Sequence, residues 1–135
     1  MSTQRKPTQK AAPSELAQLK AGLKAFFRIT ESWKLNRDQR RKLLGSPGTT
    51  LYTEWKAGDV KARAVSTDLL DRLSYILGVY KALKTMHSDE NQRLFLTNAA
   101  HVAPFNDKSP LQYMLSGHLV ALADVRRYLD YHRGV

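Results

Sequence analysis

The apolar residues of this chain recur at intervals of three and four, and this spacing is the feature that most constrains its fold. Leu19 and Leu23 belong to one such series, and Leu69, Leu73 and Ile76 belong to another. Because side chains at these intervals share one face of an α-helix, the pattern predicts amphipathic helices. No segment sustains the alternation of a half-buried strand, so we expect an all-α protein.

Residues that can cap or end a helix divide the chain into seven expected helices. The N-terminal caps that we assign are Ser14, Asn36, Gly48 or Thr49, Ser66 or Thr67, and Ser88. Asn36 and Gln39 have the spacing of a capping box, and Gly45 suits the left-handed position after a helix. The expected helices cover residues 15–33, 37–44, 50–57, 67–86, 89–97, 111–115 and 118–132.

Positive charge is concentrated in the first half of the chain. The 135 residues have a formal net charge of +10, and residues 1–63 hold 14 Lys and Arg against 5 Asp and Glu. Residues 64–135 hold 8 against 7, so they are almost neutral. A basic surface is typical of proteins that bind polyanions, and the asymmetry predicts a different role for the second half. A basic, solvated surface without a partner is the alternative.

Two short expected helices in the basic half are joined by the turn Ser46-Pro47-Gly48, which is typical of a helix-turn-helix motif. The second helix of this motif enters the major groove of DNA with its N-terminal residues at the base edges. We predict base contacts from Thr49, Thr50, Tyr52 and Thr53, and phosphate contacts from Lys56, Arg37, Arg40 and Arg41.

This assignment turns Leu51 and Trp55 inward and leaves Tyr52 exposed. Two alternatives stay open. Tyr52 could belong to the core with the arginines on a solvated face, and residues 49–53 are also rich in strand formers. The flanking glycines and the short length favour a helix.

The sequence excludes several classes of site. It has no cysteine, which rules out disulfides, thiolate-bound metals and thiol catalysis. Its four histidines are 14, 17 and 14 residues apart, so no two form a metal-binding pair on one helix turn. No Gly-x-Ser-x-Gly elbow or phosphate-binding glycine loop occurs. We therefore expect no enzyme activity, no catalytic residue, no metal and no cofactor.

No segment has the character of a membrane span or a secretory signal. The longest uncharged run, residues 109–123, is shorter than the roughly 20 apolar residues that a span needs. The first residues are polar and basic, without the apolar region of a signal peptide. We expect a cytoplasmic protein that does not enter the membrane.

The near-neutral second half requires its own explanation. Its apolar residues could form a second core, extra packing on the first domain, or a surface that binds a protein. Residues 125–134 combine tyrosine and arginine, which are enriched where protein interfaces concentrate their binding energy. A partner-binding segment near residue 130, for self-association or for a second chain, is therefore one of three interpretations that the composition leaves open.

The ordered set of motifs resembles the Xre/MbcA/ParS-type antitoxins of toxin–antitoxin operons. Residues 33–35, 43–45, 52–56 and 74–83 are similar to the Xre-like helix-turn-helix pattern of that family. Phe105 and residues 110–111, 114–117, 125–130 and 133–134 are similar to its toxin-binding domain. The resemblance implies a helix-turn-helix domain over 13–86 and a small helical toxin-binding domain over 87–135. The polar, basic composition of residues 1–12, which have no counterpart in the family, predicts a disordered arm.

The resemblance also implies partners. These are operator DNA in the protein's own promoter, a second copy of the antitoxin in a hetero-oligomeric complex, and a cognate RES-domain toxin that consumes NAD. The C-terminal segment of such an antitoxin covers the active site of the toxin. The residues carried over to this contact are Met114, Arg126, Arg127, Tyr128, Tyr131, Arg133 and Gly134. Two other functions stay open: a stand-alone dimeric transcription regulator, and an antitoxin without DNA binding.

Overall fold

The computed structural model describes residues 12–132, and within this range every regular element is a helix. The elements in chain order are α1 (Pro13–Ser32), α2 (Arg37–Leu43), α3 (Thr49–Lys56), the short 3₁₀ helix η1 (Ala62–Ala64), α4 (Thr67–Met86), α5 (Asp89–Thr97), α6 (Pro110–Met114) and α7 (Leu119–His132). The predicted all-α fold is confirmed. The expected basic arm lies outside the described residues, except for Ala12.

Most helices begin where the sequence predicts. Asn36 accepts a hydrogen bond from the Gln39 backbone N–H at 2.8 Å, and the Gln39 side chain accepts one from the Asn36 N–H at 2.8 Å, which completes the capping box. Ser66 and Ser88 cap α4 and α5 through their hydroxyls. These caps stabilise helix ends because they satisfy backbone N–H groups that lack a partner within the helix.

The expected cap at Ser14 is wrong. Helix α1 begins at Pro13 with Ala12 at the cap position, and the Glu15 side chain accepts a hydrogen bond from the Ala12 N–H at 3.1 Å. The fixed backbone angle of proline suits the first helical position, and its missing N–H costs nothing there. Proline and glutamate together therefore start the helix two residues earlier than a Ser14 cap allows.

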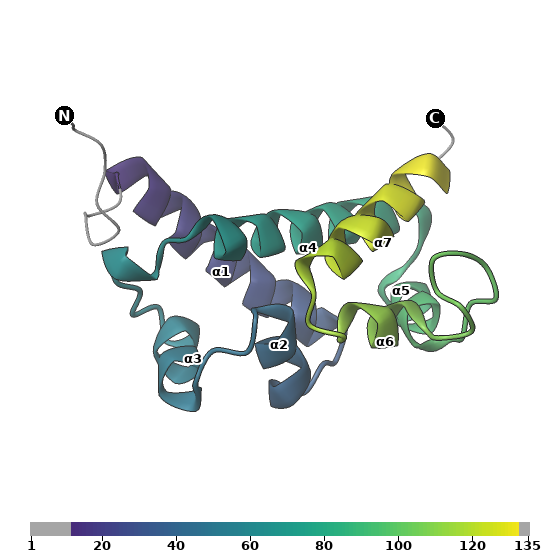
Figure 1. Cartoon of the computed structure of the whole chain (residues 1–135), viewed down its shortest axis with the longest axis horizontal. Coiled ribbons are helices and arrows are strands. Elements are labelled where there is room, and N and C mark those ends of the chain that lie inside the picture. The colour runs from purple at the N-terminus through teal and green to yellow at the C-terminus, as the bar shows by residue number, and fades with distance from the viewer. Residues whose placement is uncertain (1–11, 133–135) are drawn as a thin grey trace.

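Helix α4 is the central element of the fold. It packs against α1 on one side and against α7 on another, while α2 and α3 lie together below this layer in Figure 1. The buried residues form one cluster that includes Phe26 of α1, Ile76 of α4 and Val125 of α7. The hydrophobic core therefore continues across residue 86, where the sequence suggests a domain boundary.

Polar contacts also join the two parts of the chain. The Trp33 indole N–H at the end of α1 donates to Gln92 Oε1 of α5 at 3.1 Å, and both side chains are buried. Arg93 of α5 donates to the Ser32 carbonyl at 3.2 Å. These bonds hold α5 against the end of α1.

A buried arginine ties the helix-turn-helix to the turn before α7. Arg72 of α4 donates to the Gly117 carbonyl at 2.9 Å and to Asp68 Oδ2 at 2.7 Å, and it lies 3.5 Å from the Leu43 carbonyl at the end of α2. The Leu43 carbonyl lies at a helix end, where carbonyls lack partners within the helix. The guanidinium has several N–H donors, so it can serve this carbonyl and that of Gly117 together.

Candidate nucleic-acid and partner interfaces

The turn between α2 and α3 is built by local backbone geometry. Gly45 has a φ of +90° and ends α2, and Ser46 follows with a φ of +61°. The Arg41 Nε then donates to the Pro47 carbonyl at 2.9 Å, which fixes the turn against α2. Gly48 occupies the cap position of α3. The predicted helix-turn-helix motif is therefore present.

Helix α3 presents threonines to solvent. Thr49, Thr50 and Thr53 are exposed, and so is Lys56 at the far end of the helix. The Thr53 hydroxyl donates to the Thr49 carbonyl at 2.9 Å, so its oxygen still has acceptor capacity. Threonine can bond to base edges or phosphates, and its methyl group can meet a thymine methyl. The surface of α3 has chemistry that suits the major groove.

The expected exposure of Tyr52 is wrong. Tyr52 is only 2% exposed, and its ring lies 5.5 Å from that of Phe27 in a T-shaped contact. Leu51, which we expected inside, is 39% exposed. Tyr52 and Trp55 are three residues apart and share the face of α3 that meets α1. Both aromatic side chains are buried there, and the smaller Leu51 is turned toward solvent. The structure agrees with the alternative that places Tyr52 in the core.

The exposed Leu51 is the residue that sequence reasoning missed on this surface. It lies beside Thr50 in the first turn of α3. An apolar side chain there can contact a thymine methyl. The sequence signal that could have identified Leu51 as exposed is the size of its neighbour Tyr52. Burying the larger tyrosine side chain removes more surface from water than burying leucine does.

The three arginines predicted to bind phosphate differ in their exposure and in their contacts within the protein. Arg37 is exposed, and its guanidinium carbon lies 5.8 Å from the centre of the Tyr52 ring. Arg40 is half-buried. Arg41 is held by the Pro47 carbonyl and lies 3.6 Å from Asp38. Arg37 is therefore the freest of the three to contact a phosphate.

The residues predicted to bind a toxin separate into different environments. Met114 is fully buried in the core, so its expected place at a surface is wrong. Its apolar side chain belongs to the single hydrophobic core cluster. Arg133 and Gly134 lie outside the described residues.

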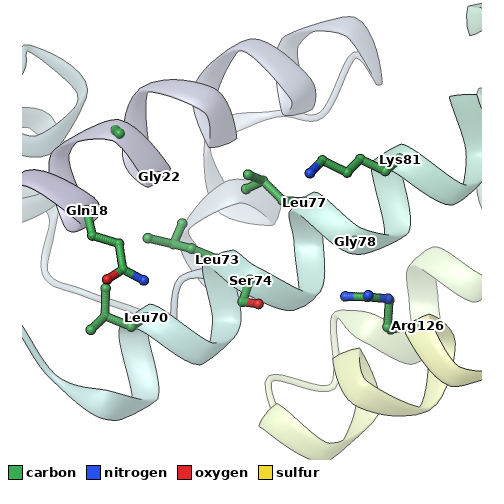
Figure 2. Close-up of a pocket in the computed structure, with 10 residues that line it drawn as sticks. Gln18, Gly22, Leu70, Leu73, Ser74, Leu77, Gly78, Lys81 and Arg126 are labelled. Carbon is green, nitrogen blue, oxygen red and sulfur yellow. The ribbon is translucent and has the colours of Figure 1, made fainter. Parts of the chain in front are cut away.

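Arg126 faces a groove between α1, α4 and α7. Figure 2 shows its side chain beside Gly78, with Lys81 one turn further along α4. The groove has a volume of about 470 Å³. Arg126 Nε also donates to Asp130 Oδ2 at 3.0 Å on its own helix. Arg126 is thus engaged within the protein and points away from the other α7 residues of the predicted set.

Arg127, Tyr128 and Tyr131 line a second groove, of about 520 Å³, between α7 and the loop 102–104. Tyr131 is 75% exposed, while Tyr128 is half-buried with its ring 5.0 Å from that of Phe105. The Arg127 guanidinium pairs with Asp124 at 3.1 Å and is mostly exposed. Val102, on the facing loop, is 51% exposed. This second groove, called the C-terminal groove below, combines apolar surface with one accessible cation.

One titratable group near the C-terminal groove is perturbed. The Tyr113 hydroxyl donates to Asp124 Oδ2 at 2.6 Å. This hydrogen bond, aided by burial and by the negative charge of Asp124, raises the pKa of Tyr113. Within residues 12–132, no group of three His, Asp or Glu side chains could hold a metal ion. None of the described helices is both long and apolar enough to cross a membrane.

The fold and the α2–α3 surface define a helix-turn-helix protein with a further helical region. A family model described as the antitoxin Xre-like helix-turn-helix domain matches residues 12–78. The chain is also similar to the uncharacterized protein y4oB of Sinorhizobium fredii (strain NBRC 101917 / NGR234), with 36% identity over 129 residues, 95% of this chain and 97% of that protein. No solved structure matches the chain.

The chain therefore belongs to the same family as y4oB, and its residues 12–78 match the antitoxin Xre-like helix-turn-helix domain. This domain family is a regulatory, DNA-binding one and not a family of enzymes. The match ends at Gly78 within α4.

Proposed function

We propose that this protein is the antitoxin of a type II toxin–antitoxin pair. It binds its own promoter through α3 as a homodimer, and its C-terminal segment covers the active site of a RES-type, NAD-degrading toxin. The observation that carries the proposal is that two exposed surfaces of different chemistry lie on separate elements. One is the threonine face of α3, and the other is the C-terminal groove.

The C-terminal groove suits a protein partner. Tyr131 and Val102 expose apolar surface on its two sides, and large exposed apolar residues that gather in one place mark interaction sites. Arg127 adds a guanidinium that can pair with carboxylates or phosphate-binding groups in the cleft of an NAD-consuming enzyme. We assign Arg133 and Gly134 to the same contact on the resemblance alone.

The decisive experiment deletes residues 131–135 and measures NAD consumption by the toxin in a mixed assay. We expect the truncated protein to bind promoter DNA as the full chain does, because α3 is untouched, and to leave the toxin active. The double variant Arg127→Ala/Tyr131→Ala should weaken inhibition without shortening the chain. Lys84→Ala, at an exposed position on α4, is the matched control and should inhibit fully. Full inhibition by the truncated protein would contradict the proposal.

The DNA-binding half is tested on α3. Thr50→Val and Thr53→Val remove one hydroxyl each and keep the side-chain shape. Each should cost about 1 kcal/mol of discrimination between promoter and random DNA if that hydroxyl makes a hydrogen bond to a base. Circular dichroism should show an unchanged fold because both positions are exposed.

A stand-alone dimeric regulator is the second candidate. The observation that favours it is that α7 packs along α4, so the C-terminal half also stabilises the helix-turn-helix. A reading frame for a RES-domain toxin beside this gene supports the antitoxin. If no such frame exists and no toxin co-purifies, the regulator is the better description.

A further inference from the structure

A second basic surface lies outside the helix-turn-helix motif, in a groove between α1 and the end of α3. The groove has a volume of about 490 Å³, and its basic residues are Lys20, Lys24, Arg28 and Lys56. Its floor includes Leu23 and Phe27. Among the residues that line it, Glu31 is the sole acid. We refer to it as the basic groove.

The cations of the basic groove are not neutralised within the described part of the chain. All four are exposed, and none of them takes part in the ion pairs found there. Lys20, Lys24 and Arg28 are spaced four residues apart, so they form one stripe along α1. Like charges at this spacing destabilise a helix, and the fold retains them without an internal partner. An external polyanion would relieve this repulsion.

The dimensions connect the basic groove to the recognition surface. Helix α3 has eight residues and spans about 12 Å, which is close to the roughly 12 Å width of the major groove. When Thr49 and Thr50 reach base edges, Lys56 at the other end of α3 lies at the height of the bordering backbone. The stripe from Lys20 to Arg28 spans about 12 Å more, along which one DNA strand carries roughly three phosphates.

We propose that the basic groove binds the phosphate backbone of the DNA that α3 recognises, with Lys20, Lys24 and Arg28 as phosphate contacts outside the helix-turn-helix. This inference rests on the proposed DNA binding and extends it from α3 to α1. The contacts add affinity and carry no sequence information, because phosphates are the same at every base pair.

The test compares two double variants with the same change in charge. Lys20→Gln/Lys24→Gln removes two cations from the basic groove, and Lys84→Gln/Lys108→Gln removes two exposed cations elsewhere. Binding of the full-length protein to labelled promoter DNA is measured by fluorescence anisotropy at several salt concentrations. The slope of log K against log salt is negative, and each lost phosphate contact should make it less steep by about 0.9. We expect the steepness to fall by nearly two for the groove variant and to change little for the control.

The groove variant should also weaken binding to promoter and random DNA by the same factor, whereas Thr50→Val should affect the promoter selectively. Lys20→Glu/Lys24→Glu should weaken both further. Thermal unfolding of the glutamine variant should occur at the same or a higher temperature, because the change removes repulsion along α1.

Three outcomes would overturn the inference. If the wild-type protein binds the promoter and the two double variants have equal slopes, the basic groove makes no phosphate contact, while DNA binding by α3 stands. If the groove variant binds DNA normally but no longer captures the purified toxin, the groove holds an acidic protein surface instead. If the wild-type protein binds no DNA, the inference and the DNA half of the proposed function both fail.

Discussion

Arg126 of α7 lies directly against Gly78 of α4, at a point where a β-carbon on residue 78 would come within 2.0 Å of the arginine Nη1. The same guanidinium is bonded to Asp130 on its own helix. Because residue 78 is a glycine and has no β-carbon, the Arg126 side chain fits between α4 and α7. Because Arg126 contributes to internal packing, its effect on toxin binding has to be separated from its effect on folding.

Substitution of Gly78 should have opposite effects in two backgrounds. In the wild type, Gly78→Ala displaces the Arg126 side chain, and we expect a loss of about 1 kcal/mol in the free energy of unfolding. In an Arg126→Ala background the obstacle is gone, and alanine should stabilise α4 by about 0.5–1 kcal/mol because it favours a helix over glycine. Urea unfolding followed by circular dichroism measures both. Equal effects in the two backgrounds would show that Arg126 and residue 78 are not coupled.

Removal of the Tyr52 hydroxyl should raise stability slightly and leave DNA binding intact. That hydroxyl is buried and has no hydrogen-bond partner among the described residues. A buried polar group without a partner costs free energy, so Tyr52→Phe should stabilise the fold by up to about 1 kcal/mol. The aromatic contact with Phe27 is preserved. A clear loss of affinity for promoter DNA in this variant would restore the original assignment of Tyr52 as a base contact.

The contrast between Tyr52 and Asn36 shows what the sequence could predict. The capping box at Asn36 depends on a residue three positions away, so its chemistry is local and visible in the sequence. The orientation of α3 depends on α1, which supplies Phe27 to the buried face. Helix α3 has only eight residues, so its few apolar positions do not show which of its faces is buried. That prediction also requires knowing that α3 packs against α1.

The candidate site was predictable to a different extent in its two parts. The α2–α3 motif and its exposed threonines follow from turn chemistry and short helices, and the structure places them as expected. Met114 could not be assigned in this way, because an apolar residue has the same local pattern in a core and at an interface. The stripe of cations on α1 was visible in the sequence, but its proximity to Lys56 depends on how α3 packs.

Arg72 should contribute strongly to stability, because it bonds segments that are far apart in the chain. Arg72→Ala leaves the Gly117 carbonyl without its donor, and we expect a loss of about 3 kcal/mol. Arg72→Lys keeps the charge but not the fork of donors, so it should recover only part of this loss.

The matched control for Arg72 is Asp68→Ala. Asp68 is its ion-pair partner, but the Asp68 side chain is 56% exposed, so its removal should cost less than about 1 kcal/mol. Chemical denaturation of the three variants ranks them. Similar losses for Arg72→Ala and Asp68→Ala would mean that the carbonyl contacts contribute little.

The Tyr113–Asp124 hydrogen bond should make stability fall at alkaline pH. The pKa of Tyr113 is raised in the folded protein, above the ordinary value of 10.0, by the bond to Asp124, by burial and by the charge of Asp124. A group whose pKa is raised by folding contributes its full stabilisation below the unfolded pKa. That contribution is lost as pH rises from about 10 through the folded pKa, since the unfolded state releases the proton more readily.

Tyr113→Phe should therefore cost about 1 kcal/mol near neutral pH and less as the pH rises above about 10. Unfolding free energies of both proteins over that range measure the difference, and tyrosinate absorbance follows the titration itself. Tyr131→Phe is the control, because Tyr131 is 75% exposed and its hydroxyl has no hydrogen bond to the described residues. If the gap between wild type and Tyr113→Phe stays constant with pH, the bond to Asp124 does not control the ionisation of Tyr113.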